Sequence, residues 1–368
     1  MQQQNSSASA WISPLLHEAL AQIQARRPLA LHGLQAGGKA WLLAALAARL
    51  SAPLVVVCDS LRRAEALAED LAFHAPSRPV HLFPHWDTVP YDGFSPNKDV
   101  MAQRLQALSA LLAGAAPLVV TTPQAWQQGM IPLSELRRLT FELRRGGRYP
   151  RAELVERLGA AGYVRVDLVE AAGEFSARGE IVDVFPIQLE HPLRMDFFDD
   201  ELESLRQFDV GDQKSFQDVE AVTVYPASEG VVDRTSAARA LKRVPHFKAQ
   251  VQPEFYRQLV HCLQQATPYP GHEQMLGLFY ERVSWLDEAL PPETVVVLDE
   301  PPLLEQTAEH FYAEVLGEQE LTLRQGNLAL PPEEFYRTVA EWRQALARFY
   351  RIPAHALRLE GTREALVC

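Results

Sequence analysis

Hydrophobic positions in the first 138 residues follow two alternating patterns. Continuous apolar runs rich in β-branched residues predict buried strands at 53–60 and 117–123, and a shorter apolar run precedes Gly33. Apolar residues at helical spacing predict helices over residues 14–26, 39–50, 61–75 and 97–114. Because strands and helices alternate, this part of the chain is expected to form a parallel sheet covered by helices on both faces.

The pattern changes after about residue 138. Apolar and polar residues then alternate with a period of two, which predicts short half-buried strands at 139–145, 163–170, 179–187, 193–200, 203–209 and 220–226. A single amphipathic helix, over about 150–161, interrupts them. This stretch is therefore predicted to form a small, mostly antiparallel α+β domain.

Helices return from about residue 226, and residues 293–302 again form a buried apolar strand of the first kind. We therefore expect an α/β fold in which the parallel-sheet domain is split in sequence. Its parts would be residues 1–138 and 226–330, with an inserted α+β domain at 139–225. Residues 331–368 are expected to form a helix, at 331–350, and a connector toward the next domain of a longer chain. The buried face of that helix would hold Phe335, Val339, Trp342, Leu346 and Phe349.

Composition narrows the classes of function. The 368 residues are 47% hydrophobic and carry a formal net charge of -12, so a main role in gripping the nucleic-acid backbone is not expected. Six arginines between residues 137 and 151 form a local basic cluster, which is either a DNA surface or a solvated turn and helix start. The three cysteines are far apart, as in a protein of the reducing cytoplasm. No apolar run is long enough to span a membrane, and the first ten residues do not look like a signal peptide.

A glycine-rich stretch near the start resembles a phosphate-binding loop. Gly33, Gly38 and Lys39 preserve the G-x-x-x-x-G-K frame between an apolar run and a predicted helix. The next residue, Ala40, lacks the hydroxyl that would hold Mg²⁺. Three interpretations remain: a relic of a nucleotide fold, a working ATPase, or a glycine turn that only resembles one. Too few residues follow Leu330 for the second lobe of a motor, so no catalysis is expected from this chain alone.

The second half of a nucleotide site would be acidic and would stand at the end of a neighbouring strand. Asp299 and Glu300 end the apolar run at 293–302 and fit that position. An aromatic stretch at 85–96 is either a base-stacking loop or an ordered loop packed against its own sheet. The sequence contains no other catalytic motif, and its 11 histidines do not have metal-ligand spacing.

The stretch LRMDFFDD, starting at residue 193, predicts a strand with two different faces. Period two places Leu193, Met195 and Phe197 on the core side. The opposite side carries Arg194, Asp196 and Phe198. An exposed phenylalanine beside an arginine is typical of an interface hot spot, although a second layer covering Phe198 is the alternative.

Three segments give the chain a family resemblance. FPHWDTVPYDGFSPNKDVMAQRL, FSARGEIVDVFP and LRMDFFDDELESLRQFDV closely resemble the amino-terminal part of bacterial transcription-repair coupling factors, and the similarity runs from about residue 15 to the end. R-G-x-x-x-D-x-F-P followed by R-x-D-F-F-D-D-E is shared mainly with that family and with the excision-nuclease B subunit. The resemblance implies a P-loop NTPase-like (RecA-like) domain with a degenerate nucleotide site and an inserted domain that binds the excision-nuclease A subunit (UvrA).

Carried over by motif, the contact with UvrA would fall on Arg178, Arg194 and Phe198. The resemblance implies no cofactor for this chain, whereas the motor domains of the full-length family use ATP and Mg²⁺. RNA polymerase and duplex DNA would bind through other domains of the full-length protein. The alternative is a DNA helicase fragment like the excision-nuclease B subunit. Ala40 and the missing DNA-gripping hairpin near residues 85–96 both favour the first interpretation.

Overall fold

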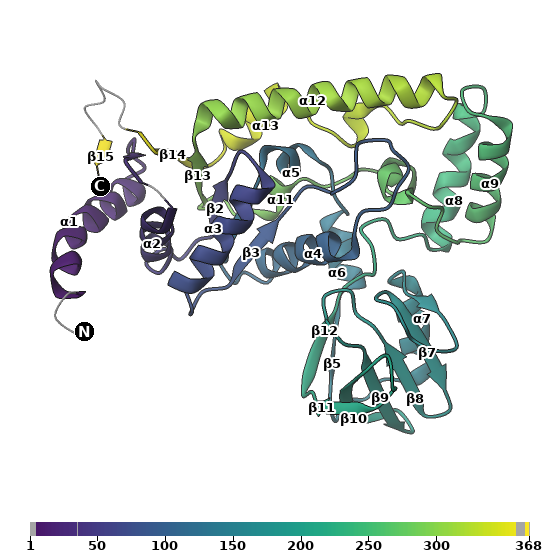
Figure 1. The fold of residues 1–368 in the computed structure, drawn as a ribbon. Coiled ribbons are helices and arrows are strands. Elements are labelled where there is room, and N and C mark those ends of the chain that lie inside the picture. Colours follow the sequence, from purple (N-terminus) through teal and green to yellow (C-terminus); the bar gives the residue numbers. More distant parts are fainter. Residues whose placement is uncertain (1–4, 35, 358–364, 368) are drawn as a thin grey trace.

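A seven-stranded sheet forms the centre of the larger part of the molecule (Figure 1). The computed structural model describes residues 5–34, 36–357 and 365–367. Neighbouring strands of this sheet pair in parallel. Their order is β15 (Ala365–Val367), β1 (Ala30–His32), β14 (Tyr350–His355), β13 (Val295–Asp299), β2 (Leu54–Val57), β4 (Leu118–Thr121) and β3 (Val80–Phe83). The expected α/β class with a parallel sheet is confirmed, although β3 and β14 were not predicted.

Helices cover both faces of the parallel sheet, because its central strands are apolar on both sides. In β2, Leu54 and Val56 belong to the core beneath one helical layer, and Val55 and Val57 belong to the core beneath the other. The first layer consists of α1 (Asn5–Gln24), α2 (Ala36–Ala47) and α3 (Leu61–His74). The second consists of α4 (Lys98–Leu112), α5 (Pro123–Gln127), α11 (Leu286–Ala289), α12 (Pro301–Arg324) and α13 (Val339–Leu346).

Residues 141–224 build two further sheets, which lie below the parallel sheet in Figure 1. The six-stranded sheet has the order β11 (Ser215–Asp218), β10 (Glu201–Phe208), β9 (Leu193–Phe198), β8 (Ile181–Val184), β7 (Glu174–Arg178) and β6 (Val164–Arg165). The two-stranded sheet pairs β5 (Phe141–Arg144) with β12 (Ala221–Val224), and α7 (Arg151–Ala160) completes the unit. All strand pairs except β6–β7 are antiparallel, as the period-two pattern predicted.

The strand predicted over 163–170 is wrong beyond its first residues. Only Val164 and Arg165 pair with β7, and the chain then folds across the side of the six-stranded sheet that carries Ser176. There the carbonyl of Asp167 accepts a hydrogen bond from Ser176, and the buried Val169 offers its carbonyl to Gln213. These side-chain hydrogen bonds replace the ladder that a longer strand would have made.

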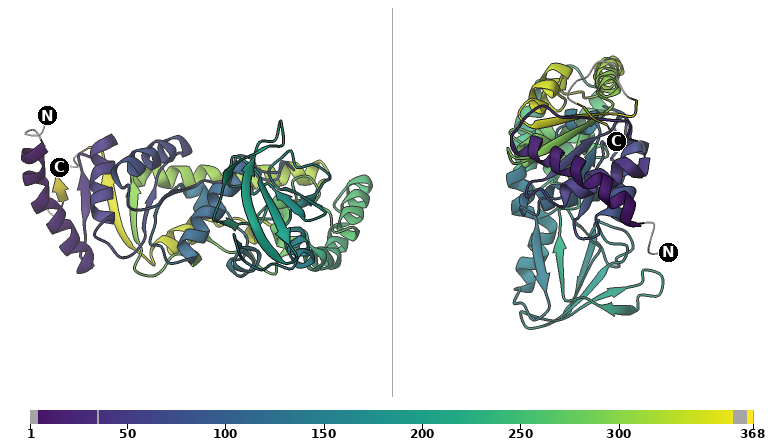
Figure 2. Two further views of the ribbon diagram at one scale, coloured as in Figure 1. Left: turned by 90° about the horizontal axis from the view of Figure 1, so that it is seen from below. Right: turned by 90° about the vertical axis from the view of Figure 1, so that its left-hand side faces the viewer.

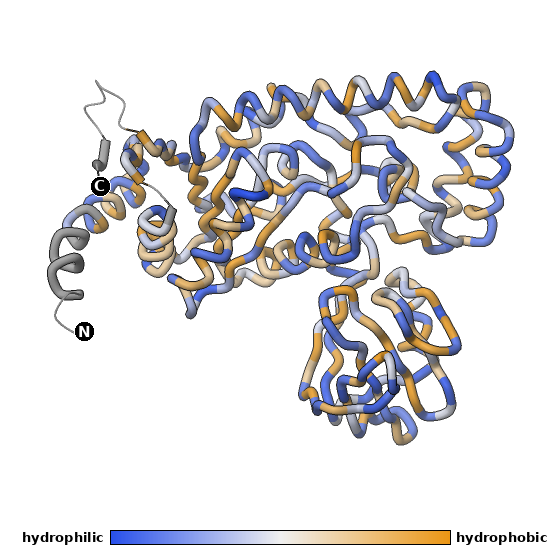
Figure 3. The backbone as a smooth tube through the Cα atoms, viewed as in Figure 1, coloured by the Kyte–Doolittle hydropathy of each residue, from blue (hydrophilic) through white to orange (hydrophobic). Residues whose placement is uncertain are grey.

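A helical unit follows the small sheets and lies at the far end of an elongated molecule (Figure 2). It contains α8 (Arg234–Arg243), η1 (Val244–Phe247), α9 (Pro253–Gln264), η2 (His272–Met275) and α10 (Leu276–Phe279). The 24-residue helix α12 begins directly after β13, at the end of the parallel sheet. It was not predicted, and hydrophobic and hydrophilic stretches alternate along it (Figure 3).

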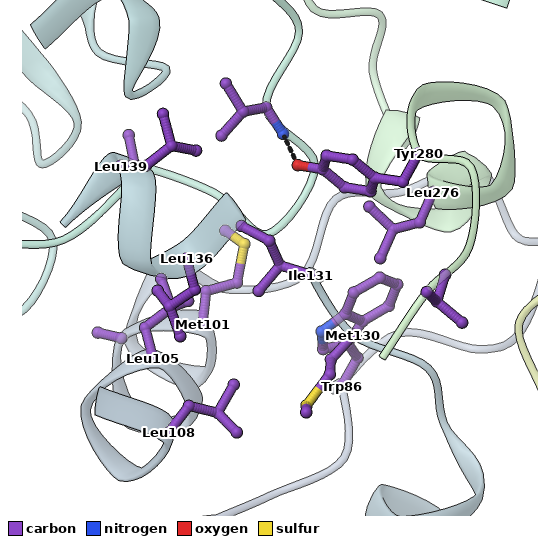
Figure 4. Close-up of a cluster of buried hydrophobic side chains, with 14 of the residues drawn as sticks. Trp86, Met101, Leu105, Leu108, Met130, Ile131, Leu136, Leu139, Leu276 and Tyr280 are labelled. Carbon is purple, nitrogen blue, oxygen red and sulfur yellow. Dashed lines mark hydrogen bonds between the residues drawn. The ribbon is translucent and has the colours of Figure 1, made fainter. Parts of the chain in front are cut away.

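A buried cluster joins the parallel-sheet domain to the following units (Figure 4). It brings together Trp86, residues of α4, residues of α6 (Leu133–Leu139) and Tyr280. Beside it, Arg104 and Glu229 form an ion pair with no exposed side-chain surface, and Trp86 Nε1 donates to the same carboxylate. The aromatic stretch at 85–96 is therefore an ordered loop packed against its own domain.

The helix predicted over 331–350 is wrong in extent. Pro332 opens a short 3-10 turn, η3 (Pro332–Glu334), and α13 begins only after Thr338, whose side chain forms a capping box with Glu341. From Tyr350 the chain enters β14, which lies between β1 and β13 in the parallel sheet rather than leading away from it. The apolar residues that suggested one helical face are nevertheless buried, namely Phe335, Trp342, Leu346 and Phe349.

Candidate docking surface and degenerate nucleotide loop

The glycine-rich stretch joins β1 to α2, as its sequence context predicted. Helix α2 begins at residue 36, three residues earlier than expected, so Gly38 and Lys39 lie inside the helix rather than in a loop before it. Gly33 makes the turn with φ 77°, a conformation that favours glycine, and its N–H donates to the carbonyl of His355. Of the three frame residues, only Gly33 therefore lies in the connection between β1 and α2.

Lys39 and Asp299 meet at the carboxyl edge of the parallel sheet. Lys39 Nζ donates to Asp299 Oδ1, and both side chains are buried. Arg63 lies on the far side of the same carboxylate, with Nη2 3.7 Å from Asp299 Oδ2. Burial acts to lower the pKa of Arg63, but Asp299 and Asp59 outweigh it and raise that pKa above its ordinary value. The two predicted halves of a nucleotide site are thus adjacent, and they neutralise each other.

The position after Lys39 offers no metal ligand. Ala40 is fully buried and has no hydroxyl. Glu300 accepts a hydrogen bond from the backbone N–H of Ala356 and lies 3.8 Å from His355. In the part of the chain that the structure describes, no three His, Cys, Asp or Glu side chains are placed to hold a metal ion.

The six-stranded sheet separates the two faces of β9 as the period-two pattern predicted. Leu193, Met195 and Phe197 are buried in the core that the sheet shares with α7. Phe198 is 67% exposed, so no second layer covers it. The strand register proposed from the sequence is therefore confirmed.

Asp183 organises the opposite face. It lies at the centre of β8, is opposite Arg194 of β9 in the strand register, and is only 1% exposed. Arg194 donates two hydrogen bonds to the carboxylate of Asp183, from Nε to Oδ1 at 2.8 Å and from Nη2 to Oδ2 at 2.9 Å. Arg178 Nη2 donates to Oδ2 of the same carboxylate at 3.3 Å. One buried carboxylate therefore holds two arginines from two different strands.

The two arginines are not equivalent. Arg194 also donates through Nη1 to the carbonyl of Gln213 at 2.9 Å, and its guanidinium lies 4.4 Å from the ring centre of Phe208. Its side chain is only 17% exposed, whereas that of Arg178 is 53% exposed. The hydrogen bonds to Asp183 raise the pKa of Arg194. The two arginines come from strands that are not adjacent, because β8 lies between β7 and β9.

Sequence analysis missed Asp183, although a signal was present. A carboxylate in the middle of the apolar stretch IVDV must either face solvent or find cationic partners, and the arginines at 178 and 194 supply them. Asp196 and Arg206 form a second pair on the same face, and Ser204 donates to that carboxylate at 2.5 Å. Charged side chains of both signs therefore lie on this face along four neighbouring strands, β7 to β10.

Three of the six arginines in the cluster at 137–151 are paired with carboxylates. Arg138 pairs with Glu135, Arg144 pairs with Glu142, and Arg145 Nη1 lies 3.7 Å from Glu220. These pairs are exposed, so they reduce the local positive charge without adding much stability. The arrangement favours the interpretation as a solvated turn and helix start over a DNA surface.

Comparison with known proteins identifies the unit that carries the exposed phenylalanine. The family described as "UvrB interaction domain" matches residues 141–229, the segment that contains β5 to β12. The chain is 31% identical over 320 residues to the transcription-repair-coupling factor of Escherichia coli K12, with 85% of this chain and 27% of that protein covered. The corresponding factor of Myxococcus xanthus is 29% identical over 366 residues, with 94% and 30% covered. That of Bacillus subtilis 168 is 27% identical over 311 residues, with 81% and 26% covered.

The chain is therefore a protein with a UvrB-type interaction domain beside a parallel α/β domain. Over most of its length it is similar to the transcription-repair-coupling factors. It spans about a quarter of the length of the curated relatives that it matches. Among the helices that the structure describes, none is long and apolar enough to cross a membrane.

Proposed function

We propose that this chain is the repair-recruitment module of transcription-coupled nucleotide excision repair. Its UvrB-type domain would dock the excision-nuclease A subunit, UvrA, and bring it to a stalled RNA polymerase. The observation that carries the proposal is the exposed face of β7 and β9 within the matched segment, where Arg178 and Phe198 protrude from a folded sheet. A cation beside an aromatic anchor suits a partner surface that presents carboxylates and an apolar pocket.

The remaining activities of the pathway would belong to other parts of a longer protein. Contacts with RNA polymerase and duplex DNA, and ATP-driven translocation with Mg²⁺, are proposed for regions beyond the matched quarter of the relatives. Within this chain, the pairing of the 137–151 arginines and the net charge of -12 support weak affinity for duplex DNA.

The parallel-sheet domain would be a P-loop NTPase-like, RecA-like domain that has lost its chemistry. Support comes from the G-x-x-x-x-G-K frame between β1 and α2 and from Asp299 at the end of β13. In this proposal the UvrB-type domain is an insertion, because residues 141–224 separate β4 from β13, which lie in one sheet with β2 between them. The buried pairing of Lys39 with Asp299 supports loss of nucleotide hydrolysis.

A DNA helicase fragment like the excision-nuclease B subunit is the less favoured alternative. Such a fragment would need a nucleotide loop that binds Mg²⁺ and a segment that grips DNA. Ala40 cannot supply the hydroxyl ligand, and the loop at 85–96 is anchored by Trp86 and Tyr91, both buried.

A direct binding measurement tests the proposal. The purified chain is titrated with UvrA by calorimetry, and Phe198→Ala is compared with Phe73→Ala. Phe73 is the matched control because it is a phenylalanine on α3 that is even more exposed than Phe198 and lies outside the matched domain. We expect wild type and Phe73→Ala to bind equally and Phe198→Ala to bind more weakly. Absence of binding by the wild-type chain would overturn the proposed function.

A further inference from the structure

The outer face of the six-stranded sheet contains a carboxylate that docking alone does not explain. Asp183 is a charged side chain with 1% exposure at the centre of β8, too buried to be a main contact for a protein partner. A buried carboxylate is costly unless it is paired and hydrogen-bonded, and both of its oxygens are occupied by arginines. Its position between β7 and β9 connects the two strands that carry the proposed contacts.

We propose that Asp183 is a positioning residue, an inference that rests on the proposed function. It holds the exposed Arg178 in place for a carboxylate on the partner, and Arg194 acts through Asp183 rather than by touching the partner. Arg178 would then be the cationic contact of the face, and Phe198 would be its apolar anchor. Arg194 and Asp183 would form the support beneath them.

The use of hydrogen-bond donors supports this division of roles. Arg194 donates from Nε and Nη2 to Asp183 and from Nη1 to the carbonyl of Gln213, in the turn between β10 and β11. Its guanidinium also stacks on the buried Phe208, so all of its nitrogens already have partners within the domain. For Arg178, the described part of the chain shows a single side-chain hydrogen bond, at 3.3 Å to Asp183. Most of the N–H groups of Arg178 are therefore left for an outside acceptor.

Charge balance identifies the chemistry of that acceptor. The single charge of Asp183 is shared between two guanidinium groups, so this trio of side chains carries a net positive charge at neutral pH. The nearby Asp196 is already paired with Arg206. An acidic side chain of the partner, reaching Arg178 from outside, would balance this positive charge and form a charge-assisted, bidentate pair with Arg178.

A double-mutant cycle tests the inference. Asp183→Asn, Arg178→Ala and the combined variant are titrated with UvrA at a temperature well below their melting points. If Asp183 acts by positioning Arg178, Asp183→Asn weakens binding by roughly tenfold in the wild-type background and by little in the Arg178→Ala background.

Asp287 supplies a matched control. It is also 1% exposed and also binds two arginines, Arg337 and Arg348, but it lies outside the UvrB-type domain. Asp287→Asn should cost stability and leave the affinity for UvrA unchanged. If Asp183→Asn behaves in the same way, Asp183 only stabilises the fold and the inference is wrong, while binding by the wild type preserves the proposed function.

A second variant covers the case in which Asp183→Asn does not fold. Arg194→Lys keeps a cation beside Asp183 but loses the planar fork. If Arg194 acts by positioning Arg178, Arg194→Lys should weaken binding to UvrA in the wild-type background and have little effect in the Arg178→Ala background. An equal loss in both backgrounds would mean that Arg194 touches UvrA directly, and the proposed division of roles would be overturned.

Discussion

Phe197 and Phe198 are consecutive residues of β9, and they lie on opposite faces of the six-stranded sheet. Phe197 is 4% exposed and packs in the core, whereas Phe198 is 67% exposed. The alternation of side chains along a strand is the cause, because successive Cβ atoms point to opposite faces. One residue therefore holds the fold and its neighbour is available to a partner.

Substitutions at these two positions test stability and docking separately. Phe197→Ala should lower the free energy of unfolding by about 3–5 kcal/mol, because it removes a large core side chain. Phe198→Ala should leave that free energy nearly unchanged and weaken binding to UvrA by roughly 1–4 kcal/mol. Denaturant melts and calorimetric titrations of both variants measure the two effects. If both variants fold and bind like wild type, the partner docks elsewhere.

A substitution at Gly38 tests whether the nucleotide loop is a relic. Gly38 lies in α2 with ordinary helical geometry, and an added Cβ would meet nothing within 4 Å. Gly38→Ala should therefore raise the free energy of unfolding by about 0.5–1 kcal/mol, the difference in helix propensity. Thermal melts with and without ATP measure this. Stabilisation of the wild type by ATP, absent in Gly38→Ala, would show that the loop still binds phosphate.

The buried pair at the same loop leads to a prediction about catalysis. Lys39 is held by Asp299, and Ala40 offers no ligand for Mg²⁺, so we expect no ATP hydrolysis above background. A steady-state phosphate-release assay compares wild type with Lys39→Ala. Turnover in the wild type that disappears in the variant would contradict this prediction, whereas weak nucleotide binding alone would not.

Predictions from the sequence succeeded where a pattern reflects burial on one or both faces. The parallel strands at residues 54–57 and 118–121 and the register of β9 follow from side chains that must leave water. Helix α12 was missed because exposed leucines, at 303, 316, 321 and 323, obscure the stripe of buried apolar residues. The helix at 331–350 was predicted too long because Phe335 and Phe349 are buried but lie outside α13. Phe335 directly follows η3, and Phe349 directly precedes β14.

The candidate site was predictable only in part, for a related reason. Strand period identified Phe198, but it could not reveal that Asp183 clamps Arg194, because hydrogen bonds between strands depend on sheet order. That order places β8 between β7 and β9 and so brings Arg178 and Arg194 to either side of Asp183. The buried contact between Lys39 and Asp299 likewise joins residues that are 260 positions apart, so it depends on the order of the strands in the parallel sheet.

Histidine burial gives a prediction for the pH dependence of stability. Burial, aided by Arg104, lowers the pKa of His85 from 6.5 to about 4. Between these two pKa values the unfolded chain binds more protons than the folded chain, so the free energy of unfolding falls as the pH falls. The stability that neutral His85 provides is therefore complete above about pH 6.5 and is lost as the pH falls toward 4. The loss should reach up to about 3 kcal/mol. Denaturant melts of wild type and His85→Gln from pH 7.5 to 4 should therefore converge at low pH, and parallel curves would contradict the prediction.

Competition for UvrA tests the central claim most directly. If this chain docks through a UvrB-type interaction domain, it and the excision-nuclease B subunit should occupy the same surface of UvrA. A labelled sample of the chain, bound to UvrA, is titrated with unlabelled B subunit and followed by fluorescence anisotropy. We predict that the B subunit displaces the labelled chain completely, along a one-site curve. When the unlabelled Phe198→Ala variant of the chain is the competitor instead, it should displace the labelled chain poorly. Retention of the label in a ternary complex with both proteins, at saturating B subunit, would contradict the central claim.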